Sequence, residues 1–341
     1  MNLYNLLLKA EEKYGKKKII EELNIVSGTY NRWKIKQEVP RDYLFDLMRI
    51  CELEINYNSF TPKEKNQYFT PLYTVKYCFN IVQNELSRFV NLEEYYWIEP
   101  SAGSGNFLSV LPPEKFYALD VEPKHELVQK INYFDWHPPV NKKTIVIGNP
   151  PFGLRGQQAL KFINKALKES DFVCFILPPL FNSDGRGTPK KRIKGKLLGT
   201  WECDSSYNYP DGSPVKVQTI FQIWTRLDIG EDKVEENVSP NGYKIYSLSD
   251  GGTPGTTRNK DKIDKCDFYL PSTCFGEEKM NILYNFKDLP QQRGYGIIVE
   301  NKEILEKAKK IDWKKISFNS TNGALNLRMS LIINALNKKE N

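Results

Sequence analysis

The chain has 341 residues, of which 40% are hydrophobic, so it is long enough for one large domain and one or two small ones. Its 49 basic and 42 acidic residues give a net charge of +7, which is compatible with a nucleic-acid partner but does not require one. Because it has only two histidines, and six cysteines without paired spacing, we expect no metal site, no histidine-based triad, no disulfide framework and a reducing, cytoplasmic setting.

Residues 1–60 are predicted to form a small helical domain. The apolar start is interrupted by Lys9, unlike a signal peptide, and no apolar run is long enough to cross a membrane, so we expect no membrane partner. Apolar residues recur at helical spacing, and Ser27 is a suitable N-cap for a short helix that reaches Trp33. This layout resembles helix-turn-helix domains of the phage-repressor type, and the alternative is a helical cap on the next domain. The side chains expected to point outward are those of Thr29, Tyr30, Asn31 and Arg32.

A polar stretch, residues 58–67, is predicted to be a linker. After it, Tyr68-Phe-Thr-Pro71 is predicted to start a helix over residues 72–89, with Thr70 as N-cap and Pro71 at the first helical position. Proline suits that position because a backbone N–H there would have no partner within the helix.

An alternation of strands and helices follows. It predicts an α/β fold with a Rossmann-like, doubly wound and largely parallel sheet. One helix is expected after the first strand and its glycine-rich loop, and another over residues 157–168. Ligands of such sheets bind at the carboxyl ends of the strands. The predicted strands cover residues 95–99, 115–120, 131–135, 144–148 and 171–177.

Beyond residue 178 the alternation stops. Residues 187–196 are basic and glycine-rich, and residues 216–226 are predicted to be a last strand of the sheet. A polar linker is expected over residues 228–240. The remainder, residues 240–341, mixes short apolar stretches with glycine, threonine and basic residues, so we predict a separate small domain of mixed structure.

Polar residues follow the first three predicted strands. Gly103-Ser-Gly105 lies where a nucleotide-binding loop belongs, but Leu108 stands at the third glycine of the dinucleotide fingerprint, which argues against NAD. Glu99 can accept from the ammonium group of a ligand, and Asp120 from both hydroxyls of a ribose. Asp135-Trp136 offers an acceptor and a ring to an adenine. Each acid taken alone can also be a solvated strand end.

The fourth predicted strand ends in Asn149-Pro-Pro-Phe152. Two prolines fix two φ angles and remove two backbone donors, which leaves the carbonyl groups free to accept. Asn149 adds a side-chain acceptor and Phe152 a flat apolar face. An aromatic ring that carries an amine with two N–H groups, such as adenine, matches this set. The alternative is a loop that only stops a strand.

These segments together resemble the motifs of the S-adenosylmethionine (SAM)-dependent amino-methyltransferases of DNA. Tyr68-Phe-Thr-Pro71 resembles the motif that precedes the first strand in that family, and the motif order, with Asn-Pro-Pro-Phe after the glycine loop, is similar to that of the gamma group. The resemblance covers residues 64–226, which would be the catalytic domain. It implies that SAM is the cofactor. The implied cofactor-binding residues are Tyr68, Thr70, Pro71, Glu99, Ser101, Ala102, Gly103, Gly105, Asn106, Phe107, Asp120, Val121, Asp135, Trp136 and Asn149.

The resemblance also implies the catalytic residues, which are Asn149, Pro150, Pro151 and Phe152. A flipped adenine would stack on Phe152 while Asn149 and Pro150 accept its amine hydrogens, with no metal involved. Trp224 would be a second aromatic against the base, with Phe221 a weaker substitute; the alternative is that they belong to the sheet core. Tyrosine is commoner in the family than the phenylalanine at position 152, so a hydroxyl contact is lost.

The expected function is therefore sequence-specific methylation of adenine N6 in double-stranded DNA, with residues 240–341 as the target-recognition domain. The resemblance allows a companion restriction nuclease as a further partner. The alternatives are methylation of RNA or of a protein glutamine amide, or DNA binding by a fold without catalysis. Basic residues expected to contact phosphates are Lys190, Lys191, Arg192, Lys194, Arg258 and Lys260.

Overall fold

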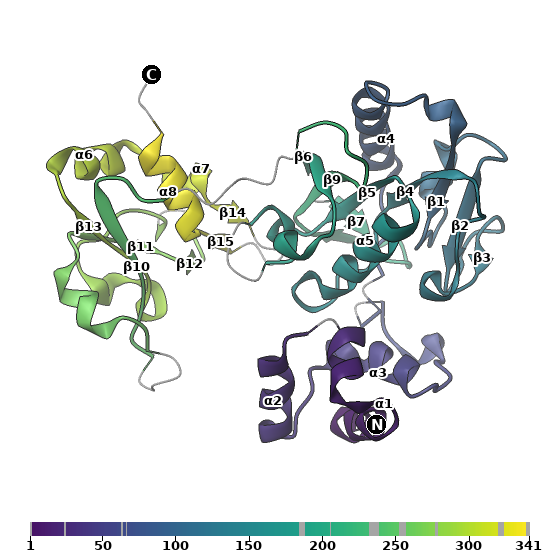
Figure 1. Ribbon diagram of the computed structural model, residues 1–341, viewed down its shortest axis with the longest axis horizontal. Coiled ribbons are helices and arrows are strands. Elements are labelled where there is room, and N and C mark those ends of the chain that lie inside the picture. Colours follow the sequence, from purple (N-terminus) through teal and green to yellow (C-terminus); the bar gives the residue numbers. More distant parts are fainter. Residues whose placement is uncertain are drawn as a thin grey trace.

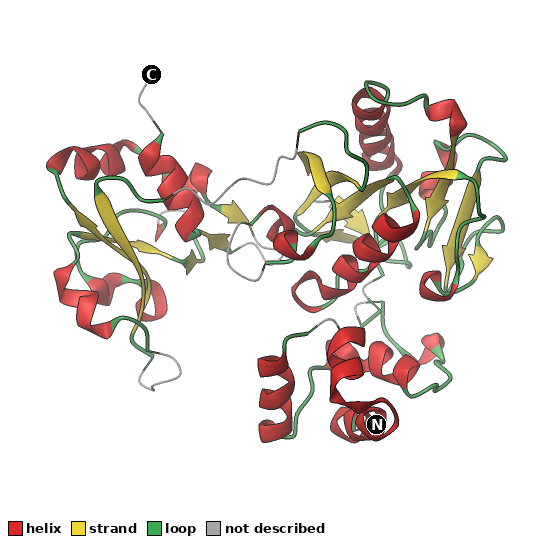
Figure 2. Cartoon of the chain, viewed as in Figure 1, coloured by secondary structure: helices red, strands yellow, loops and turns green. Residues whose placement is uncertain are grey.

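The computed structural model describes most of the chain (Figures 1 and 2). The predicted linker after residue 228 lies largely outside the described residues, as do Gly187 and Thr256 of the two basic segments. Within the described ranges, no helix combines the length and the apolar character that crossing a bilayer needs. The described residues are 2–23, 25–62, 64–65, 67–183, 188–204, 206–231, 239–251, 257–276, 279–319 and 324–338.

A mostly parallel sheet of seven strands forms the centre of the structure, as the sequence predicted. Its order is β3-β2-β1-β4-β5-β9-β6. This is the order of a doubly wound sheet with one additional strand, β9, which runs antiparallel to both of its neighbours. The strands are β1 (Tyr95–Glu99), β2 (Phe116–Asp120), β3 (Gln129–Lys130), β4 (Lys143–Gly148), β5 (Phe172–Leu177), β6 (Lys196–Cys203) and β9 (Thr219–Thr225).

Two α-helices cover opposite faces of this sheet. Because side chains alternate along a strand, Ile145 and Ile147 of β4 pack on the face covered by α4 (Leu72–Leu86), whereas Val146 packs on the face covered by α5 (Gln157–Glu169). Both faces of the central strands are therefore buried. Their largely apolar sequences follow from this arrangement.

Two predictions within the sheet domain were wrong. Residues 131–135 are not a strand, because the Asn132 side chain accepts from the backbone N–H of Phe134 (3.0 Å) and starts the 3-10 turn η5 (Tyr133–Asp135). β3 is a two-residue strand just before it. The glycine loop is followed only by a 3-10 turn, η4 (Asn106–Ser109), since the prolines at positions 112 and 113 prevent a longer helix.

Other boundaries also differ. The last strand is shorter than predicted, and β6, whose first residue ends the basic segment, was not predicted. A hairpin of β7 (Ser206–Asn208) and β8 (Pro214–Lys216) was not predicted either. Further 3-10 turns of the chain are η1 (Arg41–Tyr43), η2 (Tyr57–Ser59), η3 (Leu92–Glu94), η6 (Leu154–Gly156), η7 (Pro179–Asn182), η8 (Lys190–Arg192), η9 (Lys260–Lys265), η11 (Phe286–Asp288) and η12 (Pro290–Gln292).

The N-terminal part is helical, with α1 (Leu3–Glu22), α2 (Ser27–Lys36) and α3 (Leu44–Ile50) around their own core. Gly15, at φ 73°, kinks α1 and divides it into two shorter helical stretches. The second stretch, a turn and α2 follow one another along the chain. Two details differ from the prediction. Val26 rather than Ser27 occupies the N-cap, and Tyr30 is 1% exposed in the core instead of pointing outward.

This helical part packs against the sheet domain beside α5 (Figure 1). The Lys161 Nζ and Asp46 Oδ1 atoms lie 2.9 Å apart, with side chains only 10% and 11% exposed. The guanidinium of Arg49 lies 5.6 Å from the centre of the Phe134 ring. Leu154 of the sheet domain packs against the N-terminal core. An ion pair, a cation–π contact and an apolar contact therefore join the two parts.

The C-terminal part has a hydrophobic core of its own, which includes the buried Trp313. Its structure mixes two small antiparallel sheets with three helices (Figure 2). The strands are β10 (Tyr243–Ser249), β11 (Phe268–Pro271), β12 (Thr273–Cys274), β13 (Arg293–Val299), β14 (Phe318–Asn319) and β15 (Leu325–Asn326), and the helices are α6 (Lys302–Lys310), α7 (Trp313–Ile316) and α8 (Met329–Asn337).

The buried pair between Lys161 and Asp46 generates a prediction for stability. Asp46→Ala leaves the lysine buried without its counter-ion, so we expect a loss of about 3 kcal/mol in the free energy of unfolding, measured by urea denaturation. The control is Lys18→Ala, which removes the i,i+4 pair of an exposed lysine with the half-buried Glu22 and should change stability little. Equal effects of the two substitutions would contradict the prediction.

Candidate functional site

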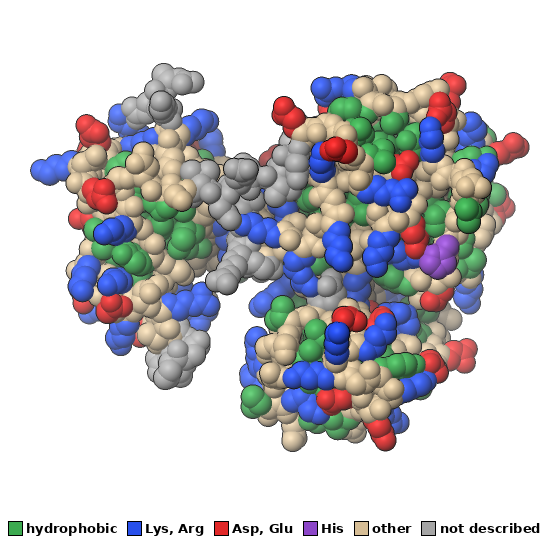
Figure 3. Space-filling view, in the orientation of Figure 1, with side chains coloured by type: hydrophobic (Ala, Val, Ile, Leu, Met, Phe, Trp, Pro, Cys, Tyr) green, Lys and Arg blue, Asp and Glu red, His purple; other side chains and the backbone are tan. Residues whose placement is uncertain are grey.

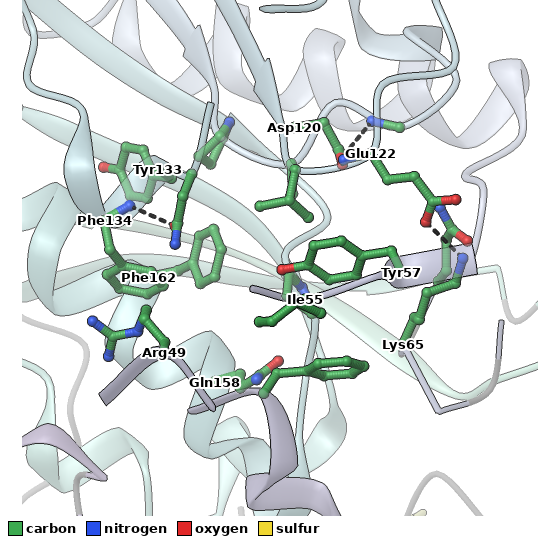
Figure 4. Close-up of a pocket in the computed structure, with 18 of the residues that line it drawn as sticks. Arg49, Ile55, Tyr57, Lys65, Asp120, Glu122, Tyr133, Phe134, Gln158 and Phe162 are labelled. Atoms are coloured by element: carbon green, nitrogen blue, oxygen red, sulfur yellow. Dashed lines mark hydrogen bonds and ion pairs between the residues drawn. The ribbon is translucent and has the colours of Figure 1, made fainter. Parts of the chain in front are cut away.

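A cavity of about 560 Å³ lies at the carboxyl ends of β1, β2 and β4 (Figure 4). A volume of this size suits a cofactor or a small substrate. Its wall includes residues of the glycine loop, of the Asn-Pro-Pro-Phe corner and of the N-terminal helical part. Among the residues predicted for the site, those that line the cavity are Tyr68, Ser101, Gly103, Asp120, Val121, Asn149 and Pro151.

The glycine loop folds tightly onto the end of β2. The N–H of Gly103 donates to Asp120 Oδ2 (2.8 Å), and the residue has φ 48°. A Cβ on Gly103 would lie 3.1 Å from the Phe69 ring, and one on Gly105, at φ 77°, would lie 2.7 Å from the ring of His125. Both positions therefore require glycine.

Asp120 is held by two backbone donors. Besides Gly103, the N–H of Glu122 donates to its Oδ1 (2.8 Å). Burial raises the pKa of Asp120 above its usual range, while these two hydrogen bonds act in the opposite direction. Glu122 in turn pairs with Lys65 (2.6 Å) and Lys124 (2.8 Å), so its charge is balanced. The Asp120 carboxylate is thus positioned at the cavity wall as an acceptor for hydroxyl groups.

Glu99, the last residue of β1, is buried and does not itself line the cavity. Its side chain is 2% exposed, and Oε2 has no hydrogen-bond partner among the residues that the structure describes. Burial first, and the charge of Asp120 second, raise the pKa of Glu99 well above its usual range. A Cβ on Gly148 would lie 2.2 Å from Oε1, so only glycine fits beside this carboxyl group. A buried acceptor without a donor is the kind of group that a cationic ligand would satisfy.

Three hydrogen bonds connect the separate motifs. Asn149 Nδ2 donates to Thr70 Oγ1 (3.1 Å), and the Ser101 hydroxyl donates to the Asn149 carbonyl (3.3 Å). Asn106 Nδ2 donates to the Thr70 carbonyl (2.8 Å). Thr70 was predicted as the N-cap of α4, but Pro71 occupies that position and the threonine side chain binds Asn149 instead.

The proline corner is fixed to the start of α5. The carbonyl of Phe152 accepts from the N–H groups of Gln158 (3.1 Å) and Ala159 (3.3 Å). Pro150 is buried, whereas Phe152 is half-buried and packs at the edge of both sheet cores. The ring of Phe152 thus keeps part of its surface accessible.

Several residues that were predicted for the site belong to the hydrophobic core instead. Trp224 and Phe221 are both fully buried, and the Trp224 indole donates to Gln222 Oε1 (3.0 Å). Neither therefore has a free face for a base in this structure. Ala102 and Phe107 are also buried, and pack beneath the glycine loop.

Asp135 and Trp136 do not line the cavity. Asp135 is exposed, and the Trp136 ring packs on Tyr117 at 5.4 Å. The chain turns earlier than predicted, so the acceptor and the ring at this position of the cavity are Asn132 and Phe134. Asn132 was detectable from the sequence, because an asparagine before a turn is a common N-cap.

Only some of the predicted phosphate contacts are accessible. Lys190 is 4% exposed, which corrects its assignment, and Arg192 donates to Gln157 Oε1 (3.3 Å). Lys260 is exposed but pairs with Asp250 (3.2 Å). The remaining three, which are exposed, are Lys191, Lys194 and Arg258.

The cavity also has walls that the sequence did not reveal. Phe45, Ile55 and Tyr57 come from the N-terminal part, and Phe162 comes from α5. No local motif marks these residues, since their position depends on how the N-terminal part packs on the sheet domain. Lys65 also lines the cavity, although it belongs to the predicted linker.

Comparison with known proteins assigns no family. No family model and no curated protein matches the sequence. One similar solved structure, from Listeria monocytogenes, is of a protein provisionally described as a class I SAM-dependent methyltransferase. It has 11% sequence identity and a TM-score of 0.33, and the match covers 67% of this chain and 82% of that chain.

The unpartnered carboxyl group of Glu99 generates the second prediction. Its raised pKa means that the folded chain retains a proton that the unfolded chain loses, so stability falls as the pH rises above the ordinary value of 4.5. Glu99→Gln removes this titration and should stabilise the ligand-free protein at neutral pH, with a gain that disappears at acid pH. Thermal unfolding from acid to neutral pH measures this. A difference that does not change with pH would refute the assignment.

Proposed function

We propose that this chain transfers a methyl group from SAM to N6 of an adenine in double-stranded DNA. The observation that carries the proposal is the position of Asn149, which Thr70 and Ser101 attach to the glycine loop at the wall of one cavity. Because the amide Nδ2 is engaged by Thr70, the side-chain oxygen remains as the acceptor.

The residues around the cavity fit the parts of SAM. The Asp120 carboxylate would accept from the ribose hydroxyls, and Asn132 and Phe134 would bind and stack on the adenine. Glu99, whose Oε2 has no partner among the described residues, would accept from the ammonium group. When bound, SAM supplies a methyl group activated by a sulfonium.

The reaction needs positioning rather than a strong base. The N6 lone pair of adenine is delocalised into the ring, which makes the amine a poor nucleophile. Asn149 Oδ1 and the Pro150 carbonyl would accept its two hydrogens and favour a tetrahedral nitrogen, as preorganised acceptors do. The half-buried Phe152 would stack on the flipped base. Trp224 is fully buried, so the proposal assigns it no contact with the base.

DNA as the substrate is supported by charge and by shape. Arg32 and Lys36 are exposed on α2, the second helix of the N-terminal helix-turn-helix-like segment. Figure 3 shows Lys and Arg side chains on the sheet domain where it borders the N-terminal and C-terminal parts. Such surfaces suit a phosphate backbone. Residues 240–341 would then select the target sequence.

The third prediction tests the role of Asn149. Asn149→Ala should lower the methylation rate by about 100-fold or more, since it removes an acceptor for the reacting amine, while SAM binding should change only a few-fold. The assay measures transfer of labelled methyl groups to duplex DNA, RNA and protein. Ser109→Ala, an exposed position in η4, is the control and should retain full activity.

Each outcome of that assay bears on the proposal. Label in DNA at adenine N6, lost in Asn149→Ala, supports it. Label only in RNA or at a glutamine amide would change the substrate, and DNA affinity without any transfer would mean a binding protein with a methyltransferase-like sheet.

A fourth prediction concerns pH. Glu99 must be ionised to accept from the ammonium group of SAM, and burial raises its pKa in the free protein. Binding therefore releases a proton, so the SAM affinity should rise as the pH increases from the ordinary value of 4.5 to neutral. Adenosine lacks the ammonium group, so its binding should depend less on pH over this range, through Asp120 alone, as calorimetry can measure. The same pH dependence for both ligands would count against this role of Glu99.

A further inference from the structure

The N-terminal helical part supplies one wall of the cavity that the proposed function assigns to SAM. Phe45 lies in α3, and Ile55 and Tyr57 follow this helix, yet all three line the cavity together with Asp120. Figure 4 shows Ile55 and Tyr57 projecting into the cavity between Asp120 and Gln158. A segment predicted to bind DNA, or to cap the next domain, thus contributes side chains to a small-molecule site.

Aromatic packing fixes the position of Tyr57. Its ring centre lies 5.6 Å from that of Phe45, which packs edge-on against Phe60 at 4.9 Å. Burial first, and then the charges of Asp120 and Glu122, raise the pKa of the Tyr57 hydroxyl. The hydroxyl therefore stays protonated at neutral pH and can donate.

Contacts on both sides of the cavity hold this wall in place. Lys65 pairs with Glu122 (2.6 Å), and the two side chains are 11% and 15% exposed. On the other side, Asp46 pairs with Lys161 and Arg49 lies over the Phe134 ring. Each of these contacts joins the N-terminal part, or the segment just after it, to a residue that lines the cavity.

The chemistry of the cavity identifies which half of the ligand meets this wall. Asp120 is an acceptor for hydroxyl groups, and Phe134 and Phe162 offer aromatic faces on the sheet-domain side. Across from them, Tyr57 adds a donor and a ring, and Ile55 adds an apolar surface. A ribose that carries a purine matches this combination, whereas the aliphatic, charged methionine half does not.

We propose that Ile55 and Tyr57 of the N-terminal part are cofactor-binding residues that cover the nucleoside half of SAM. The inference rests on the proposed function. Since such a ligand contacts both parts of the protein, its binding also stabilises their association, so the N-terminal part and the sheet domain should be more firmly joined in the ligand-bound protein.

The experiment measures binding of adenosine, S-adenosylhomocysteine and SAM to the full chain by calorimetry. Tyr57→Ala should weaken all three by about tenfold, because the lost contact is to the nucleoside that they share. Ile55→Ala should also weaken all three, and Tyr57→Phe tests the hydroxyl without removing the ring. The matched control is Ile35→Ala, whose side chain is 83% exposed on α2 and which should bind all three normally.

The outcomes separate this inference from the proposed function. If the Ile55 and Tyr57 variants bind all three ligands normally while Asp120→Ala does not, the inference fails and the cofactor site stands. Weakened SAM binding with unchanged adenosine binding also overturns the inference, because the residues would then meet the methionine half. If the unmodified chain binds none of the three, both fail. Should Tyr57→Ala not fold, Ile55→Ala and Tyr57→Phe decide.

Discussion

The site depends on a short series of hydrogen bonds that passes through Thr70. This residue receives one bond from Asn149 on its hydroxyl and another from Asn106 on its carbonyl. Ser101 adds a third bond, from the glycine loop to Asn149. These bonds hold together three segments that are far apart in the sequence: one before β1, one after β1 and one after β4. Without these bonds the three segments would be independent loops at the edge of a sheet.

The sheet explains why the segments meet at this edge. Parallel strands end on the same side, and both faces of the central strands are buried by α4 and α5, so only the strand ends are left for a ligand. The cost is visible in Glu99, a carboxyl group without a partner among the described residues. A buried, unsatisfied acid lowers stability, and proteins tolerate such groups where function requires them.

The sequence predicted what local chemistry determines. The strand at residues 95–99, the extent of α5, the glycine loop and the corner at Asn149 all depend on apolar periodicity, glycine or proline. The prediction was wrong where a side-chain hydrogen bond favoured a turn over a strand. Asn132 starts such a turn, and Asp135 and Trp136 therefore do not line the cavity. The prediction also failed for burial that depends on tertiary packing, as for Tyr30, Lys190 and Trp224. Tyr57 has no local signal, because its role depends on how two parts of the chain pack.

The shared wall of the cavity has a consequence for how such a chain can evolve. Domains that only touch can be exchanged between proteins by recombination, since each carries its own core. Here the helical segment at the start of the chain provides Phe45, Ile55 and Tyr57 to a cavity whose other side belongs to the sheet domain. A foreign segment grafted in its place would bring its own fold but not this matching surface. The two parts are therefore expected to be inherited together.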